Sequence, residues 1–282
     1  MLPIVSQAPQ NAAAAPRLDG RVAADWLTAF LRDELTRRGI ARAVIGLSGG
    51  VDSAVTAYLC ARAIGPQNVC AFRLPYATSS RSSLDDAQLV VDALGINCQT
   101  IEITAAVEGY LQFALDADAR RRGNVMARTR MLVLFDQSAK LGGLPIGTGN
   151  KTERLLGYFT WHADDTPPLN PLGDLFKTQV WALARHLGVP AALIDKAPSA
   201  DLEADQTDEG DLGITYAKAD AILAQLLVGY SDAQLVERGF DADDVVLVRH
   251  RVDSTHWKRH LPTTALLSGT AINEFYLRPV DL

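Results

Sequence analysis

The stretch Ala43-Val-Ile-Gly-Leu47, followed at once by Ser48-Gly-Gly-Val-Asp-Ser53, decides the fold. Its first five residues form a short apolar run between turn residues, which predicts a buried strand. The residues from about 54 to 64 predict a helix, so the loop runs from a strand directly into a helix. Its glycines free the backbone to turn, its serines offer hydroxyl groups, and a helix N-terminus carries partial positive charge. The sequence therefore predicts an anion-binding loop, and phosphate is its natural ligand.

The same alternation of strand and helix continues along the chain. Further strands are predicted at 69–74, 97–103 and 144–148, and helices at 22–38, 84–94, 124–141, 178–187 and 215–227, with Asp85 and Asp86 in the first turn of the helix at 84–94. Alternation of this kind predicts an α/β fold with a single Rossmann-like parallel sheet, helices on both faces and extra C-terminal helices. Ligands of such sheets bind at the carboxyl ends of the strands, so we expect the site in the loops after Leu47, Leu74 and Ile146.

Composition narrows the class of protein. The chain has 282 residues, 48% of them apolar and 21% charged, which excludes wholesale disorder. Its net charge of −6 argues against a nucleic-acid partner, and no apolar run is long enough to span a membrane. Cys60, Cys70 and Cys98 have neither metal-ligand nor disulfide spacing, so a cytoplasmic location is expected. We expect a flexible tail at 1–20 and one domain at 21–282.

Asp52 lies inside the predicted phosphate loop, where it would repel a bare polyphosphate. A divalent metal ion held between Asp52 and the phosphates would remove that repulsion. The loop differs from the GxxxxGK[ST] and GxGxxG patterns, since no lysine precedes Ser53. A glycine-rich turn with an ordinary capping aspartate is the alternative interpretation.

The string from Ser48 to Ser53 resembles the SGGxDS signature of the ATP pyrophosphatases. This resemblance implies an adenine nucleotide alpha-hydrolase-like fold whose loop grips the β- and γ-phosphates of ATP while AMP is transferred to an oxygen. The implied ATP-binding residues of the loop are Gly46, Leu47, Ser48, Gly49, Gly50, Val51, Asp52 and Ser53.

Two further strings are similar to motifs of the NAD synthetase family. Gly147-Thr-Gly-Asn-Lys-Thr-Glu153 matches GTxNKxE, which implies that Glu153 joins Asp52 as a Mg²⁺ ligand and that Thr148 contacts ATP. Asn170-Pro-Leu-Gly-Asp-Leu-Phe-Lys177 matches NPxGDLxK, in which the lysine contacts the ATP phosphates. The resemblance thus implies that Asp52, Glu153 and Lys177 carry the catalysis. It also implies an ATP contact at Arg73, near the adenine, and at Ser199.

The family resemblance extends to the second substrate. Gly123-Asn-Val-Met-Ala-Arg-Thr-Arg-Met131 is similar to GNxxARxRM, and Trp257-Lys-Arg-His-Leu-Pro262 to HKRxxP. The implied residues for deamido-NAD are Asn124, Arg128, Trp161, Trp257 and Lys258. Arg128 and Arg130 lie two residues apart, so they are expected on different helix faces. Trp257 stands where the family usually has histidine, and Trp161 stands where it often has lysine. The contacts with deamido-NAD are therefore expected to differ in detail from those of the family.

The resemblance covers about 26–262 and implies a reaction. Deamido-NAD is amidated with ammonia in an ATP-dependent step through an adenylated nicotinate, which releases pyrophosphate and AMP and completes NAD biosynthesis. Free ammonia, or ammonia from a separate protein, is the expected nitrogen source, because the chain has no spare length for a glutamine-hydrolysing domain. The resemblance also implies a homodimer. The alternatives are a tRNA-modifying ATP pyrophosphatase, which would favour a basic surface and a reactive cysteine, and a nucleotide-binding module without catalysis.

Overall fold

The computed structural model describes residues 16–199 and 207–260, together with 263, 265 and 267. Its framework is one parallel sheet with the strand order β3-β2-β1-β4. The strands are β1 (Arg42–Gly46), β2 (Val69–Arg73), β3 (Asn97–Thr100) and β4 (Gly143–Pro145). All three pairings are parallel, which confirms the predicted α/β class.

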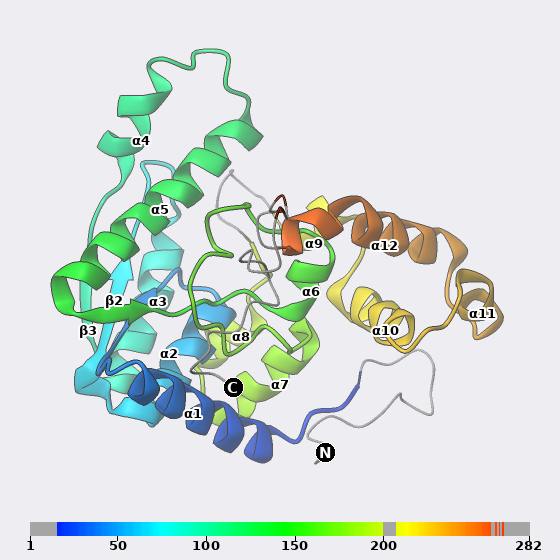
Figure 1. Cartoon of the computed structure of the whole chain (residues 1–282), viewed down its shortest axis with the longest axis horizontal. Helices are drawn as coiled ribbons and strands as arrows, with labels where there is room; N and C mark the ends of the chain where they lie inside the picture. The colour runs from blue at the N-terminus through cyan, green and yellow to red at the C-terminus, as the bar shows by residue number, and fades with distance from the viewer. Residues whose placement is uncertain (1–15, 200–206, 261–262, 264, 266, 268–282) are drawn as a thin grey trace.

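Helices follow and surround these strands (Figure 1). They are α1 (Gly20–Arg37), α2 (Val51–Ile64), α3 (Arg81–Leu94), α4 (Thr104–Leu111), α5 (Ala119–Leu141), α6 (Lys151–Leu155), α7 (Lys177–Leu187), α8 (Ala191–Asp195), α9 (Asp208–Leu212), α10 (Tyr216–Leu226), α11 (Asp232–Glu237) and α12 (Ala242–Thr255), with 3-10 helices η1 (Pro66–Asn68) and η2 (His256–Arg259). None of the helices in the described part of the chain is long and apolar enough to cross a bilayer.

The two faces of the sheet pack against different helices, because neighbouring residues of a strand point to opposite faces. Ala43 and Ile45 of β1 belong to the core that includes α1, α2, α3 and α7. Val44 belongs to a second core with Phe72 of β2 and Leu134 of α5. Helices therefore cover both faces, as predicted.

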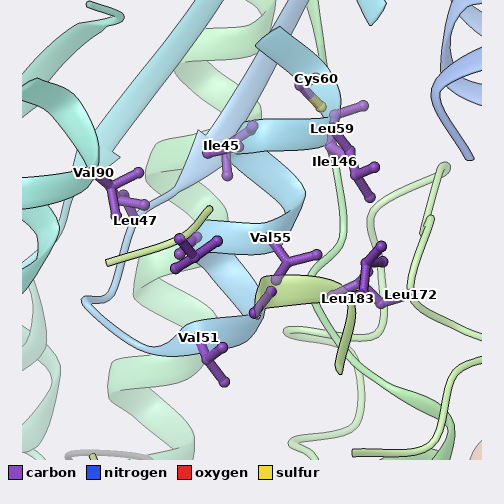
Figure 2. Packing of buried hydrophobic residues seen from close by; sticks show 14 of the residues in the cluster. Ile45, Leu47, Val51, Val55, Leu59, Cys60, Val90, Ile146, Leu172 and Leu183 are labelled. Atoms are coloured by element: carbon purple, nitrogen blue, oxygen red, sulfur yellow. The ribbon is translucent and has the colours of Figure 1, made fainter. Parts of the chain in front are cut away.

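Helix α2 lies in the interior, with nine of its 14 residues buried. Figure 2 shows Val51, Val55 and Leu59 of this helix among Ile146 and Leu183 from later in the chain. Burying a side chain of this size contributes about 1.5 to 3 kcal/mol. The start of α2, where the glycine-rich loop enters it, is thus held by the main core.

The strand order places the loops after β1 and β4 side by side. The chain leaves β1 toward β2 and β3 and then returns to the opposite side of β1 at β4. The carboxyl edge between β1 and β4 is therefore the switch point where open α/β sheets bind ligands. A parallel bridge between Ile146 and Leu169 extends the sheet just beyond β4.

A third core lies beside the sheet and consists of helices. Tyr216, Leu223 and Val248 pack there with Leu156 and Phe176. These residues bring α10 and α12 against α6 and the start of α7. The predicted extra C-terminal helices are thus present, and they pack against the two helices that follow β4.

Some boundaries differ from those predicted. Helix α3 begins at Arg81 because the Ser80 hydroxyl accepts a hydrogen bond from the Ser83 amide at 3.1 Å. Asp85 and Asp86 therefore lie beyond the first turn, and their predicted position was wrong. Helix α5 likewise begins at Ala119 rather than 124, since the Asp118 carboxylate caps it. The sequence pattern predicts no helix at α4, α8, α9, α11 or α12, whose apolar patterns are short or weak.

The predicted N-terminal tail is described only at its end. Pro16 is buried, and its carbonyl accepts a hydrogen bond from the Gln179 side chain at 3.1 Å. Asp19 caps α1, which begins at Gly20. Residues 1–15 of the predicted tail and most of 261–282 lie outside the described residues.

Candidate functional site

The loop of residues 46–53, called the glycine loop below, crosses the carboxyl edge of the sheet. Gly49 has a φ of +84°, and a Cβ added there would lie 2.2 Å from the Ser83 carbonyl oxygen. Only glycine fits this close approach to α3 without strain. Gly46 ends β1, and the Leu47 amide donates to the Phe72 carbonyl at 2.8 Å. The loop is therefore tied to strand β2 and helix α3.

The start of α2 carries no side-chain cap, because Gly50 occupies the cap position. Instead the hydroxyl groups of Ser48 and Ser53 lie 3.2 Å apart, and the Gly50 amide donates to the Ser48 hydroxyl at 3.2 Å. Ser53 donates to the Gly50 carbonyl at 2.9 Å. These bonds hold the loop in a turn at the start of α2. The free backbone amides at a helix start favour the binding of an anion. Asp52 and the buried Val51 form the first turn of that helix.

A second helix start, that of α6 after β4, contacts the first turn of α2. Asn150 and Glu153 form a reciprocal cap on α6, with bonds of 3.0 and 3.1 Å. The Asn150 side chain also donates to the Asp52 carboxylate at 3.0 Å. Asn150 thus orients both carboxylates that the sequence predicts to bind Mg²⁺, Asp52 through its side-chain amide and Glu153 through its backbone amide.

The ammonium group of Lys177 lies between those carboxylates. Its nitrogen is 2.5 Å from Oδ2 of Asp52 and 3.3 Å from Oε1 of Glu153. Burial opposes the charge on Lys177, but Asp52 and Glu153 outweigh it, so the pKa of Lys177 is raised. Burial raises the pKa of Glu153 to about 8, although the charge of Lys177 acts in the opposite direction. The structure therefore brings the three predicted catalytic residues together.

The donor set of this cluster suits Mg²⁺. Two carboxylates from different elements converge on one cation, and hard oxygen ligands are those that Mg²⁺ prefers. Among the described residues no three His, Cys, Asp or Glu side chains gather to hold a metal on their own. Asp52 and Glu153 could therefore supply only part of a coordination shell, with phosphate oxygens and water as the remaining ligands.

Aromatic and acidic groups enclose Lys177 on its other side. Its ammonium lies 5.2 Å from the centre of the Tyr216 ring, within cation–π range. The Tyr216 hydroxyl donates to Asp208 at 2.9 Å, and the Tyr158 hydroxyl donates to Asp211 at 2.8 Å. Burial raises the pKa of Asp208. Tyr216 and Asp208 are not among the site residues predicted from the sequence.

The remaining residues predicted to bind ATP are Arg73, Thr148 and Ser199. Arg73 ends β2 and donates to the Gln88 side chain of α3 at 2.9 Å. Thr148 follows β4, and Ser199 is exposed at the end of a described stretch. Their role in ATP binding stays a prediction.

The five residues predicted to bind deamido-NAD form a separate cluster. Arg128 donates to the Trp161 carbonyl at 3.0 Å, and the Thr160 hydroxyl donates to Asn124 at 3.1 Å. The rings of Trp161 and Trp257 meet edge to face with their centres 5.2 Å apart. Lys258 donates to the Gly157 and Phe159 carbonyls at 2.6 and 2.5 Å, and burial lowers its pKa. All five therefore converge on residues 157–161.

The two arginines of the α5 motif do point to different faces, as predicted. Arg128 contacts the Trp161 carbonyl, whereas Arg130 donates to the Leu74 carbonyl at 3.1 Å. A cavity of about 140 Å³ between α4 and α5 is lined by Asn124 and Arg128. Two of the five residues of this separate cluster thus line the cavity.

One stretch of chain joins the two clusters. Residues 147–161 contain Glu153 of the first cluster and Trp161 of the second. Gly157 lies between them with a φ of +65°, and a Cβ added there would lie 2.4 Å from Thr255 at the end of α12. The turn at Gly157 therefore fixes the position of the second cluster relative to the first.

The cysteines lack the features of a nucleophile. Cys60 is buried in α2, and burial raises its pKa to about 12. Burial also raises the pKa of Cys70 and of Cys98. All three stay protonated at neutral pH, as expected for cysteines that fill the core.

Comparisons with known proteins agree with this geometry. A family model described as NAD synthase matches residues 23–262. The NH(3)-dependent NAD(+) synthetase of Trichlorobacter lovleyi is 48% identical over 248 residues, which cover 88% of this chain and 91% of that protein. The solved NH3-dependent NAD synthetase from Campylobacter jejuni has a TM-score of 0.77 at 29% identity and covers 88% of this chain and 100% of its own. The NMN synthetase from Francisella tularensis also has a TM-score of 0.77, at 32% identity, and covers 88% of this chain and 99% of its own.

The matched range 23–262 contains both clusters. The comparisons confirm the predicted enzyme class, a ligase that forms a C–N bond, and the predicted reaction, ATP-dependent amidation of deamido-NAD with ammonia. The chain belongs to the NAD synthase family.

Proposed function

We propose that the glycine loop and Lys177 bind the β- and γ-phosphates of ATP. The observation that carries this proposal is the convergence of Lys177, Asp52 and Glu153 beside the start of α2, where no side chain caps the helix. Backbone amides at a helix start and a buried ammonium group together stabilise a polyphosphate. As pyrophosphate departs, Lys177 would offset the negative charge that develops on it.

Asp52 and Glu153 are the residues that would hold Mg²⁺. Asn150 orients both carboxylates, and in the structure they already share one cation. When bound, the ion would neutralise charge on the phosphates, which these two acidic residues could not do themselves. Asn150 then acts as a positioning residue for the two ligands.

The deamido-NAD cluster would present the second substrate to the nucleotide. We infer that Asn124, Arg128, Trp161, Trp257 and Lys258 position deamido-NAD so that its nicotinate carboxylate attacks the α-phosphorus in line with departing pyrophosphate. Ammonia then attacks the adenylated carboxyl carbon, and AMP leaves as the amide forms. Orientation and charge neutralisation supply most of the rate, so no protein nucleophile is required.

Three further residues, Arg73, Thr148 and Ser199, complete the proposed nucleotide site. Arg73 lies at the carboxyl end of β2, next to the glycine loop, and Thr148 lies at the carboxyl end of β4. Both positions border the switch point of the sheet, which supports contacts with the adenosine part of ATP. Ser199 would contribute a hydroxyl group.

We further propose that the enzyme is a homodimer. Helices α4 and α5 and the turn between them expose a set of large apolar side chains, which are Tyr110, Phe113, Leu115, Leu132 and Phe135. A group of exposed apolar residues of this size is typical of a protein interface. Sedimentation equilibrium should therefore give twice the mass of the chain, whereas the mass of a single chain would contradict this proposal.

The expected setting is the cytoplasm, without a nucleic-acid partner. Cys60, Cys70 and Cys98 are all free thiols, which fits a reducing compartment. The net charge of −6 gives no global attraction for nucleic acid. A cell fractionation that placed the protein with exported proteins would contradict the cytoplasmic location.

The test of the proposed reaction combines purified protein with ATP, Mg²⁺, deamido-NAD and ammonium, and follows NAD and AMP. We expect equal amounts of both, and little product when glutamine replaces ammonium. A parallel assay replaces deamido-NAD with nicotinate mononucleotide, because one structural relative is an NMN synthetase. If the mononucleotide were the better substrate, the assignment of deamido-NAD would be wrong. Unchanged NAD formation by both Asp52→Ala and Glu153→Ala would exclude these residues as metal ligands.

A further inference from the structure

A buried carboxylate lies directly beneath the cluster of Asp52, Glu153 and Lys177. Asp220 belongs to α10, is fully buried, and accepts three hydrogen bonds. Its Oδ1 accepts from the Thr152 hydroxyl at 2.5 Å. Its Oδ2 accepts from the Thr178 amide at 2.9 Å and from the Thr178 hydroxyl at 2.7 Å. Both of its oxygens are therefore occupied by donors from other helices.

These bonds join the two helices that carry the reactive groups. Thr152 belongs to α6 and directly precedes Glu153, while Thr178 belongs to α7 and directly follows Lys177. The Thr152 hydroxyl also accepts a hydrogen bond from the Lys177 amide at 2.9 Å. The starts of α6 and α7 are thus cross-linked through one carboxylate and one hydroxyl group, immediately behind the side chains that face the phosphates.

A buried carboxylate is costly unless donors surround it, so a site of this kind tolerates little movement of its donors. Asp220 also places negative charge at the start of α7, where the helix favours it. The same helix α10 supplies the Tyr216 ring that lies against the Lys177 ammonium. Helix α10 therefore constrains Lys177 at both its backbone and its side chain.

We propose that Asp220 is a positioning residue that sets the separation of Glu153 and Lys177 for the adenylation step. The proposal rests on the function proposed above, since it assumes that these two residues act on the leaving pyrophosphate. Asp220 itself touches neither substrate; it acts through Thr152 and Thr178. Small displacements of positioned groups can lower a rate by about 100-fold, so the effect should appear in the chemical step rather than in the binding of deamido-NAD.

The experiment compares four variants of the full chain. Asp220→Asn keeps the shape of the side chain and removes its charge. Thr152→Val removes the hydroxyl group that connects Asp220 with the Lys177 amide, and Thr152→Ser restores it. Gln225→Ala is the matched control for stability, because Gln225 is fully buried on the same helix and its side-chain amide has no hydrogen-bond partner among the described residues.

Three quantities are measured for each variant: kcat and KM for NAD formation, the rate of deamido-NAD-dependent exchange between ATP and pyrophosphate, and amide hydrogen exchange at the start of α7. We expect Asp220→Asn and Thr152→Val to lower kcat and the exchange rate by about 10- to 100-fold with KM for deamido-NAD within about threefold. Hydrogen exchange at residues 177 and 178 should rise in both. Thr152→Ser should retain most of the activity, and Gln225→Ala should lower the melting temperature without a comparable loss of kcat.

If Asp220→Asn and Thr152→Val kept wild-type kcat, or lost no more than Gln225→Ala at an equal loss of melting temperature, the positioning role would be overturned. If Asp220→Asn fails to fold, the Thr152 pair decides, and equal loss in Val and Ser variants would also overturn it. A wild-type protein that forms no NAD would contradict the proposed function instead, whereas the hydrogen-exchange result at α7 would still test the cross-link.

Discussion

The two clusters of this enzyme are built in opposite ways. Around Lys177 the charged groups are buried, and the ammonium contacts the carboxylates of Asp52 and Glu153 directly. The neutral side chain of Asn150 donates to Asp52. Around Trp161 the charged groups are partly exposed and contact backbone carbonyls, and Trp257 is 52% exposed. The first cluster is therefore held together by contacts within one chain. The second presents an open surface that the substrate, and in our proposal a second chain, would cover.

The largest effect should follow from removing the shared cation of the first cluster. Lys177→Met should lower kcat by about 1,000-fold, since a buried charge that stabilises a developing negative charge contributes about that much. It should also reduce stability, because two buried carboxylates lose their partner. Steady-state kinetics and thermal unfolding measure both. Lys218→Met, an exposed lysine of α10, is the control and should behave as wild type; a loss of less than tenfold in Lys177→Met would contradict the assigned role.

The next effect concerns the backbone of each cluster. Gly49→Ala should destabilise the protein by about 3 kcal/mol, because alanine there adopts a strained φ and its Cβ meets the Ser83 carbonyl. KM for ATP should rise.

Gly157→Ala meets the side chain of Thr255 instead, so it should raise KM for deamido-NAD. Denaturant unfolding and the two KM values check this, and identical kinetic defects in both variants would show that the clusters are not separate.

A smaller effect is expected from the open cluster. Arg128→Ala should raise KM for deamido-NAD about 50-fold, because a hydrogen bond from a charged donor typically contributes a binding free energy of that size. KM for ATP should stay unchanged. Lys140→Ala, at the far end of the same helix, serves as control. A rise in KM for ATP instead would place Arg128 with the nucleotide.

The smallest effect is the pH dependence of the first cluster. Burial raises the pKa of Asp220 to about 6, well above its value in an unfolded chain. The folded protein therefore binds an extra proton between about pH 4 and 6, and the stability that this proton contributes is lost as the pH rises. Relative to Asp220→Asn, the wild type should lose about 2 kcal/mol from pH 4.5 to 7.5. Urea unfolding of both proteins at several pH values measures the difference, and a constant difference would disagree with the account.

The sequence predicted the parts of the site that depend on local pattern. A strand, a glycine-rich loop and a helix in direct succession place Ser48 to Ser53 at the sheet edge, and the switch point brings Glu153 opposite. The motifs also identified Lys177. The motif of residues 147–153 contains Asn150 without indicating its role, although an asparagine three residues before a glutamate is a capping signal.

Asp220 and Tyr216 could not have been found in this way. They lie on a helix far along the chain, and their contacts with α6 and α7 depend on how the third core packs. A buried aspartate in an otherwise apolar helical pattern is the only local signal. The early starts of α3 and α5 have a different cause, because Ser80 and Asp118 are local capping residues that extend those helices beyond their apolar pattern.

In our proposal the glycine loop holds the two phosphates that leave ATP as pyrophosphate. A crystal structure with Mg²⁺ and a non-hydrolysable ATP analogue tests it most directly. We predict the β- and γ-phosphates on the amides of residues 48–53, with the metal bound to Asp52 and Glu153 and the Lys177 ammonium on a phosphate oxygen. A triphosphate bound elsewhere, with the loop and the ion pairs of Lys177 unchanged, would contradict the account.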